Sequence, residues 1–358
     1  MKRLVNKMLL KEIIEFKNGK KKPSSKGSIP IYGGNGILGY TDQSNQNGES
    51  LIIGRVGAYC GCVYSHYGQC WVSDNAIVGK VNEGNDFYYC YYLLKRLNLN
   101  SRHVGSGQPL MTQEILNNIE INICDYETQR KVGKILKNID DKIKINSEIN
   151  NNLQELAKSI YYEKFKDKSN NGKLKDILDL YRKNVKNKDL SLKYFPVDVL
   201  PMNYLITKKG KPNEEAQSSL VEFKKYDILV GAMRVYFHRV CLAAEDGITR
   251  TTTFVLRPKN NDYLYYSLIT LDKDDFIKYA NDGSKGSTMP YAVWDNNCNE
   301  YEIYIPSTTE AKEFNELVKP LFEIQIINEK NNRDLEQLRS ILLPKLINGE
   351  IDLDKIEV

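Results

Sequence analysis

The segment "LIIGRVGAYCGCV" at residues 51–63 returns in altered form as "ILVGAMRVYFHRV" at residues 228–240. Gly54 aligns with Gly231, which sets the numbering offset between the two copies (231 − 54 = 177). Further pairs follow in the same order: "VGSGQPLM" with "DGSKGSTMP", which aligns Met111 with Met289, and then "IEINI" with "YEIYI". A repeat of this length indicates two duplicated domains, because the units of a solenoid span only roughly 20 to 50 residues.

Length and composition fit two globular domains. The chain has 358 residues, 41% of them hydrophobic, and this length exceeds the size at which single cores usually stop growing. The longest apolar run, Phe87–Leu94, is far shorter than the roughly 18 to 20 residues of a membrane span. Seven cysteines and no recognisable secretory signal predict reduced thiols and a cytoplasmic location. The net charge of +5 permits nucleic acid as a partner without proving it.

The pattern of residues predicts an α+β fold in each half. Short β-rich stretches separated by glycine run from about Leu9 to Ile123. The tyrosine-rich segments "DFYYCYYLLKRLNL" and "DYLYYSLITL" occupy matching places, and we expect them to be helices whose tyrosines pack in the core. After Cys124 comes a helix of about 40 residues without proline, and a similar helix closes the second half near Pro344. We divide the chain into a first globular domain (1–124), a central helix (125–166), a second globular domain (167–308), and a distal helix with a tail (309–358).

Apolar residues recur at the 3 and 4 spacing of a coiled-coil seam in both helices, so we expect the helices to pack on each other. Asn146 and Asn328, which match in the repeat, would be polar positions that set the register. The spacing does not decide the direction of the helices. An antiparallel pair would place the two globules at opposite ends, related by an approximate twofold axis. The residues expected in this packing are Leu136, Ile139, Ile143, Asn146, Leu153, Ile160, Ile324, Asn328, Leu335 and Leu342.

The order of these motifs resembles a known family. "IPIYGGNGILGYTD", "LIIGRVGAYCG", "GSGQPLMTQEILNNIEINI" and "ETQRKVGKILKNIDDKIKINSEI" resemble the target recognition domain and spacer helix of the specificity subunit of type I restriction-modification enzymes. "YFPVDVLP", "YDILVGAMRVYFHRV", "GSKGSTMP" and "LRSILLPKLINGEI" look like the second domain and the distal helix. "YGGNG" has no counterpart in the second half, so we expect the two domains to recognise different sequences.

This resemblance implies a non-catalytic subunit that reads a bipartite double-stranded DNA target. It implies that the subunit directs two methyltransferase subunits, and restriction subunits where these exist, to that target. The chain itself would bind no cofactor, whereas the complex would use S-adenosylmethionine, and ATP with Mg²⁺ if a restriction subunit is present.

Basic and polar residues beside the repeated glycines are the best candidates for DNA contacts, because arginine can read guanine in the major groove or grip phosphate. A local ion pair is about as common a role for any one of them. The candidates are Lys21, Lys22, Gly34, Asn35, Arg55, Tyr59, Arg102, His103, Ser106 and Gln108 in the first domain, and Arg234, Tyr236, His238, Arg239, Lys285 and Ser287 in the second.

Other kinds of site are less well supported. Gly34, Gly36 and Gly39 form GxGxxG, but the turn-forming residues that follow cannot supply the helix of a dinucleotide site. Cys60, Cys62, His66 and Cys70 have spacings that a zinc site could use, although the second domain does not repeat them. The sequence contains no phosphate-binding loop, amino-methyltransferase motif or HExxH. We therefore expect any chemistry to belong to partner proteins. A zinc-containing catalytic or binding module and a protein-binding scaffold stay open as alternatives.

Overall fold

The computed structural model describes residues 6–105, 107–185, 191–216, 219–351 and 353. The chain forms two compact units, Met1–Lys142 with Leu335–Val358, and Ile143–Asp334. The first unit contains the first globule, the start of the central helix and the end of the distal helix. The second unit contains the second globule, the rest of the central helix and the start of the distal helix.

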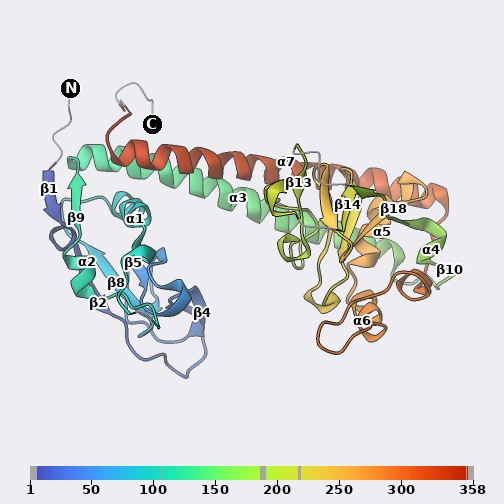
Figure 1. Ribbon diagram of the computed structural model, residues 1–358, viewed down its shortest axis with the longest axis horizontal. Coiled ribbons are helices and arrows are strands. Elements are labelled where there is room, and N and C mark those ends of the chain that lie inside the picture. The colour runs from blue at the N-terminus through green and yellow to red at the C-terminus, as the bar shows by residue number, and fades with distance from the viewer. Residues whose placement is uncertain (1–5, 106, 186–190, 217–218, 352, 354–358) are drawn as a thin grey trace. The chain divides into compact units, whose positions relative to one another are not determined.

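The first globule is built on a four-stranded antiparallel sheet with strand order β2-β8-β5-β6 (Figure 1). A three-stranded sheet, β4-β3-β7, and a two-stranded ribbon, β1-β9, accompany it. The elements are β1 (Asn6–Leu9), β2 (Ile14–Asn18), β3 (Ile29–Gly33), β4 (Gly36–Thr41), β5 (Glu49–Gly54), η2 (Gly57–Tyr59), β6 (Val63–Tyr67), β7 (Trp71–Val72), β8 (Ala76–Val81), α1 (Phe87–Arg96), α2 (Gln113–Asn117) and β9 (Glu120–Ile123), with short 3₁₀ turns η1 (Leu10–Glu12) and η3 (Leu99–Ser101).

The second globule has a corresponding sheet with strand order β11-β18-β15-β16. A second sheet, β12-β14-β17-β13, and the ribbon β10-β19 complete it. The elements are β10 (Gly172–Lys173), α4 (Leu174–Ile177), β11 (Leu178–Tyr181), β12 (Asn184–Val185), β13 (Lys193–Tyr194), β14 (Leu220–Phe223), β15 (Ile228–Gly231), η6 (Val235–Phe237), β16 (Val240–Leu242), β17 (Gly247–Arg250), β18 (Thr253–Pro258), α5 (Leu264–Leu271), α6 (Asp274–Asp282) and β19 (Glu302–Ile303), with 3₁₀ turns η4 (Val197–Val199), η5 (Asn213–Glu215), η7 (Asn261–Tyr263) and η8 (Cys298–Glu300).

The central sheets confirm the duplication that the sequence predicts. β8 and β18 have the same length, and their first residues, Ala76 and Thr253, keep the numbering offset that Gly54 and Gly231 set (253 − 76 = 231 − 54). Each lies between the strand that carries the repeated glycine and an outer strand, β2 or β11. The same four-stranded antiparallel order in both halves means that one scaffold has been used twice.

Two helices of 40 residues each follow the globules, α3 (Tyr126–Phe165) and α7 (Thr308–Ile347). Asp125 accepts a hydrogen bond from Thr128 N (3.0 Å) at the start of α3, as N-cap residues do. A capping box starts α7, because the Glu310 carboxylate accepts a hydrogen bond from Ser307 N (2.9 Å) and Ser307 Oγ accepts one from Glu310 N. The hydrogen bonds that Ser307 N and Ser307 Oγ donate to the carboxylate lower the pKa of Glu310 to about 2. Within the described ranges, no helix is long and apolar enough to cross a membrane.

The tyrosine-rich segments attach each globule to the long helices, and their tyrosines are buried in the core or packed against it, as predicted. In the first unit Tyr92 is buried and donates a hydrogen bond to Asp140 of α3 (2.6 Å), and Arg339 of α7 pairs with the same carboxylate. In the second unit Tyr265 stacks on Phe322 of α7, with ring centroids 4.7 Å apart. Aromatic side chains therefore fix the long helices to each globule.

The helices run antiparallel, and part of their seam is polar. Asn146 Nδ2 donates to Asn332 Oδ1, and Asn328 Nδ2 donates to Asn150 Oδ1, both at 2.8 Å. The repeat relates these two bonds to each other, since Asn146 matches Asn328 and Asn150 matches Asn332 at one offset (328 − 146 = 332 − 150). The seam thus has the local twofold symmetry expected of a duplicated pair, and the two predicted asparagines do bridge the helices.

A third asparagine contact brings the second globule into this polar seam. Tyr204 donates to Glu329 Oε1 (2.6 Å), and Asn150 Nδ2 donates to the same oxygen (3.2 Å) and to the Tyr204 hydroxyl (2.9 Å). All three side chains are buried. Burial and the neighbouring Glu329 raise the pKa of Tyr204, so the phenol stays protonated and serves as a donor.

The predicted packing positions fall into three groups. Leu136, Ile139 and Asn146 are buried, and the partly buried ones are Ile143, Leu153, Ile160, Asn328, Leu335 and Leu342. Ile324 is 43% exposed, so the prediction that it packs between the helices is wrong. The buried positions beside it are Gln325 and Ile326, because the packed face of α7 continues through Glu329 and Asn332.

Replacing Tyr204 by phenylalanine should lower the free energy of unfolding by about 1–3 kcal/mol, because a buried carboxylate loses its phenol donor. Chemical denaturation followed by circular dichroism measures this change. Tyr162→Phe is the matched control, since Tyr162 lies on α3 and is 62% exposed. Equal denaturation midpoints for the two variants would contradict a stabilising role for the Tyr204 hydroxyl.

Candidate nucleic-acid interface

In the first globule, the strand that carries the repeated glycine leads into a one-turn 3₁₀ helix, η2, that is joined to a hairpin loop. Gly57 N donates to Pro109 O (3.0 Å), and Met111 N donates to Arg55 O (2.8 Å). Val104 and Leu110 close the loop with two reciprocal backbone hydrogen bonds. We call η2 with its flanking residues, 55–61, the first reading turn, and 104–110 the first reading loop.

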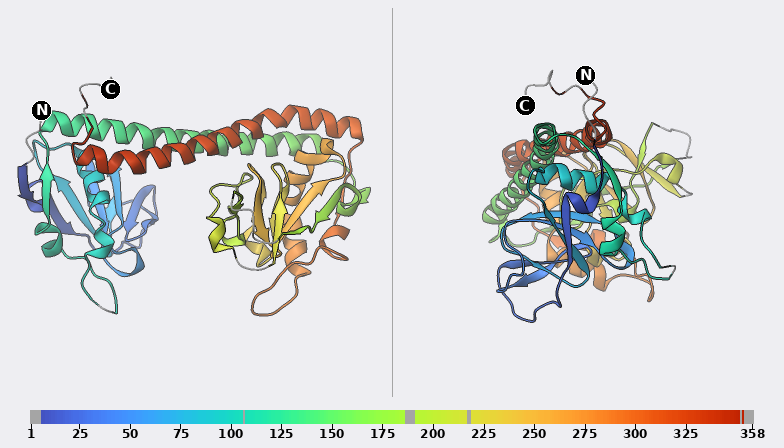
Figure 2. Two further views of the ribbon diagram at one scale, coloured as in Figure 1. Left: turned by 45° about the horizontal axis from the view of Figure 1, so that its top comes forward. Right: turned by 90° about the vertical axis from the view of Figure 1, so that its left-hand side faces the viewer.

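The second globule repeats this arrangement around η6. Arg234 N donates to Pro290 O (2.7 Å), Ala292 N donates to Ala232 O (2.8 Å), and Lys285 and Tyr291 close the loop. We call residues 232–238 the second reading turn and 285–291 the second reading loop. In each unit taken by itself, the reading loop lies at the end of the globule away from the helices (Figure 2). A loop placed in this way is free to meet a ligand as large as a DNA duplex.

The structure corrects the alignment of the two loops. Gly105 and Gly286 have nearly equal positive φ angles, 91° and 89°, and they define a larger numbering offset than the sheets do (286 − 105 = 181). Met111 therefore matches Ala292, and its predicted pairing with Met289 is wrong by three positions. Burial agrees, because Met111 is fully buried whereas Met289 is 51% exposed.

Both reading turns present a tyrosine at the same place, and they differ in the residues around it. Tyr59 and Tyr236 are 48% and 50% exposed. Arg55 of the first turn corresponds to Ala232 of the second, whereas Arg234 corresponds to Gly57. One scaffold thus carries its arginine at two different positions, as expected for domains that read different bases.

The second reading turn also contains backbone strain that the first avoids. Arg234 and His238 have φ angles of 50° and 53°, and the corresponding residues of the first turn are Gly57 and Gly61, with φ of 72° and 82°. Glycine adopts this left-handed conformation readily, whereas other residues lose about 1–2 kcal/mol each. Residues held in such conformations cluster at functional sites.

Two of the predicted arginines, Arg55 and Arg234, are partly exposed beside a reading loop. Arg55 makes one side-chain hydrogen bond, from Nη1 to Asp74 O (3.2 Å). The Nε atom of Arg234 is buried and has no hydrogen-bond partner in the parts of the chain that the structure describes. Neither guanidinium is paired with a carboxylate among those residues, so both keep donors for a phosphate or a base edge.

The structure brings together several other candidates of the first domain. Gly34 and Asn35 form the turn between β3 and β4, and a Cβ on Gly34 would lie 3.7 Å from Val56 O of the reading turn. His103 and Gln108 are exposed at the reading loop, and Arg102 precedes it, donating Nε to Leu97 O (3.1 Å). Ser106 lies outside the described residues.

The remaining candidates lie on exposed segments. Lys21 and Lys22 are exposed between β2 and β3, outside the reading turn and the reading loop. In the second domain, Lys285 and Ser287 are exposed on the reading loop. The second loop also exposes Met289 and Tyr291, which the sequence reasoning missed.

Two predicted DNA-contact residues make hydrogen bonds inside the protein, and for the largely buried ring of His238 this corrects the assignment. The ring of His238 is 14% exposed, and its Nε2 lies 3.0 Å from Asp272 Oδ1. Arg239 Nη1 donates to the carbonyl oxygens of Asp198 (3.1 Å) and Leu200. The His238 ring points into the globule because the turn that carries it packs against α6. Arg239 stays partly exposed and remains a candidate.

Three of the four residues with metal-like spacing serve separate roles, and the fourth, Cys62, is a partly buried free thiol. Cys60 lies in the main core of the first globule, and Cys70 lies in a smaller core beside β7. His66 is bound by its Nδ1 to the Tyr32 hydroxyl (3.2 Å) and by its Nε2 to Gln69 O (3.1 Å). No cluster of three potential metal ligands occurs among the residues that the structure places. The geometry thus gives the zinc alternative no support.

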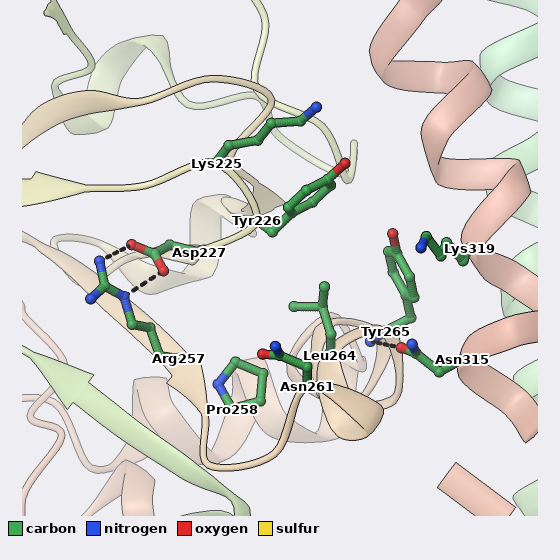
Figure 3. A pocket seen from close by; sticks show the side chains of 10 residues that line it. All are labelled: Lys225, Tyr226, Asp227, Arg257, Pro258, Asn261, Leu264, Tyr265, Asn315 and Lys319. Atoms are coloured by element: carbon green, nitrogen blue, oxygen red, sulfur yellow. Dashed lines mark hydrogen bonds and ion pairs between the residues drawn. The ribbon is translucent and has the colours of Figure 1, made fainter. Parts of the chain in front are cut away.

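A cavity of about 370 Å³ in the second unit lies apart from the reading turn (Figure 3). It opens between the turn before β15 and helix α7, and the buried Asp227 accepts two hydrogen bonds from Arg257 (2.6 and 2.8 Å) in its wall. Its lining contains none of the predicted DNA-contact residues. The cavity is therefore not part of the candidate interface.

Matched reading turns and loops on two copies of one scaffold define a duplicated recognition module. Comparison with known proteins agrees. The sequence pattern of the type I restriction modification DNA specificity domain matches residues 3–155 and 166–337. The MjaIX specificity subunit of Methanocaldococcus jannaschii is 25% identical over 309 residues, which cover 75% of this chain and 70% of that protein.

Another sequence relative and a solved structure are also similar to the chain. The EcoprrI specificity subunit of Escherichia coli is 34% identical over 111 residues, and this alignment covers 31% of the chain and only 28% of that protein. A crystal structure of a type I restriction-modification S subunit from M. genitalium superposes with a TM-score of 0.67 at 16% identity, covering 96% of each chain. That structural likeness shows the shared fold.

The chain belongs to the family of type I restriction modification DNA specificity domains, and it carries two of them. It is a specificity subunit, which recognises DNA and is not itself the catalyst.

Replacing Lys285 by alanine should weaken binding to all duplexes and reduce the slope of log K against log salt by about 0.9, the value for one lost phosphate contact. Fluorescence anisotropy at several salt concentrations measures the slope. Lys312→Ala, an exposed lysine on α7, is the control and should leave the slope unchanged. The same slope for both variants would remove Lys285 from the interface.

Proposed function

We propose that this subunit reads a bipartite double-stranded DNA target, one part with each reading turn and loop. We propose further that it directs two methyltransferase subunits, and restriction subunits where they are present, to that target. The observation that carries this proposal is the shared backbone scaffold of the two turns with different side chains placed on it. Such a pair of domains can contact two separate base sequences in the same manner.

Base reading would follow the usual division of protein–DNA contacts. Phosphate contacts from groups such as Lys285 would position each domain, and arginine or tyrosine side chains on the turns would reach base edges in the major groove. Because Arg55 and Arg234 occupy non-equivalent positions on the common scaffold, the two half-sites should differ in sequence.

Exposed apolar side chains on the long helices support docking of partner subunits. Ile145, Ile149 and Leu156 of α3 are 40–49% exposed, at spacings that place them on one side of the helix. Leu317, Ile324 and Ile327 of α7 are 43–57% exposed and also share a side. Contiguous exposed apolar residues mark interaction surfaces, so we assign these two stripes to the methyltransferase subunits.

The proposal extends to the cofactors of the complex and to its location in the cell. Methylation would use S-adenosylmethionine bound by the methyltransferase subunits, and cleavage would use ATP with Mg²⁺ bound by a restriction subunit. We expect the complex to work in the cytoplasm, where its DNA target lies.

Co-expression with its cognate methyltransferase in a methylation-free host tests the function. Mapping of modified adenines by single-molecule sequencing should show one motif with two fixed halves separated by unread bases. Arg55→Ala should relax or abolish reading of one half, and Arg234→Ala the other. An intact, bound methyltransferase that leaves the DNA unmodified would overturn the proposal and favour the scaffold alternative.

The docking stripe predicts a separate result. The double substitution Ile324→Asp, Ile327→Asp should weaken methyltransferase binding at least ~10-fold, because two charges would be placed in an apolar interface. Co-purification and calorimetric titration measure this affinity. Ile37→Asp serves as the control, since Ile37 is 49% exposed on β4 of the first globule. Unchanged affinity in the double variant would move the docking surface away from this stripe.

A further inference from the structure

The strained second reading turn is held by a chain of three polar side chains. His238, which ends the turn, places Nε2 within 3.0 Å of Asp272 Oδ1 and 2.8 Å of Asp272 O. The other carboxylate oxygen of Asp272, Oδ2, lies 2.6 Å from Lys158 Nζ. The Asp272 side chain is only 4% exposed. Both oxygens of one buried carboxylate are thus used, one toward the reading turn and one toward helix α3.

The electrostatics of this cluster are consistent with a protonated imidazole. The hydrogen bond from His238 to Asp272 raises the pKa of the imidazole, although burial acts in the opposite direction. His238 Nδ1 also faces Asp274 Oδ1 at 3.5 Å. Asp272 follows the last residue of α5, where the negative end of the helix dipole favours a cation. His238 and Asp272 line a second cavity, of about 850 Å³. The other charged residues in its lining are Lys158, Lys166, Lys168, Lys273, Asp274, Asp275 and Glu302.

The first domain cannot form this chain. Gly61 occupies the position of His238, and a Cβ there would lie 2.5 Å from Asn100 N. A glycine at residue 238 would also avoid the unfavourable φ of the second turn. The second domain therefore keeps a strained histidine where the scaffold accepts glycine, and the structural gain from that histidine is its bond to Asp272.

We propose that Lys158, Asp272 and His238 are positioning residues that hold the second reading turn, and with it Arg234 and Tyr236, in the geometry that reads the second half-site. This inference rests on the proposed function and deepens it. The residues touch no DNA themselves. They tie the turn to helix α3, so the second domain reads DNA from a turn fixed to a spacer helix, whereas the first domain has no side chain to do so at Gly61.

The test uses the complete complex with its methyltransferase. Methylation rates and affinities are measured on three duplexes: the full target, one with the second half altered, and one with the first half altered. His238→Gly, Asp272→Asn and Lys158→Met should each bind the full target about 3- to 30-fold more weakly and lose discrimination at the second half only. Lys158→Arg keeps the positive charge and should retain both the affinity for the full target and the discrimination at the second half. Lys144→Met, an exposed lysine of the same helix, is the control and should behave as wild type.

Folding and pH separate a positioning role from a merely structural one. His238→Gly relieves the unfavourable φ, so its melting temperature should not fall in parallel with the loss of discrimination. A histidine with a raised pKa holds its tie at low pH and loses it as the pH rises through that value. Wild-type affinity for the second half should therefore decline with rising pH, and in Asp272→Asn the decline should move to lower pH.

The outcomes separate the two proposals. A wild-type complex without a two-part target would overturn the proposed function. A wild-type complex that reads both halves, with variants that discriminate as it does or lose both halves equally, would overturn only the positioning role.

Discussion

The buried polar contact between the two long helices is the constraint on which the rest of the second unit depends. Asn146, Asn150, Asn328 and Asn332 pair across the seam, and Tyr204 brings the globule to the same point through Glu329. An apolar seam would tolerate sliding by a turn, whereas buried amides leave unpaired donors in any other register. The register of the helices in turn fixes where Tyr265 and Phe322 meet, and so where the sheet is attached.

The two reading turns show how one backbone arrangement can serve two recognition tasks. The hydrogen bonds that join turn and loop follow one plan in both globules, and the side chains they carry are different. A tyrosine is kept at one position, and the arginine moves by two positions. Backbone bonds do not depend on side-chain identity, so the surface can change without loss of the scaffold.

The sequence predicted the features that depend on strong local patterns, and it failed where packing decides. The repeat around Gly54 and Gly231 led to the matched sheets, and the long helical patterns led to α3 and α7. Ile324 was misplaced because the true seam of α7 is polar in that region, with Gln325 and Glu329 buried, so hydrophobicity selected the wrong side. The loop alignment failed because the spacing between the two repeats is longer after β18 than before it. His238 was misassigned because its partner, Asp272, is distant in sequence.

The composition of the first compact unit has a consequence for how the chain is made. Its core contains Leu346, Ile347 and Leu353, which are translated long after the rest of that core. The first globule leaves the ribosome early, yet part of its apolar surface stays uncovered until α7 has been made. Shortened chains that lack this segment would expose that surface to proteases.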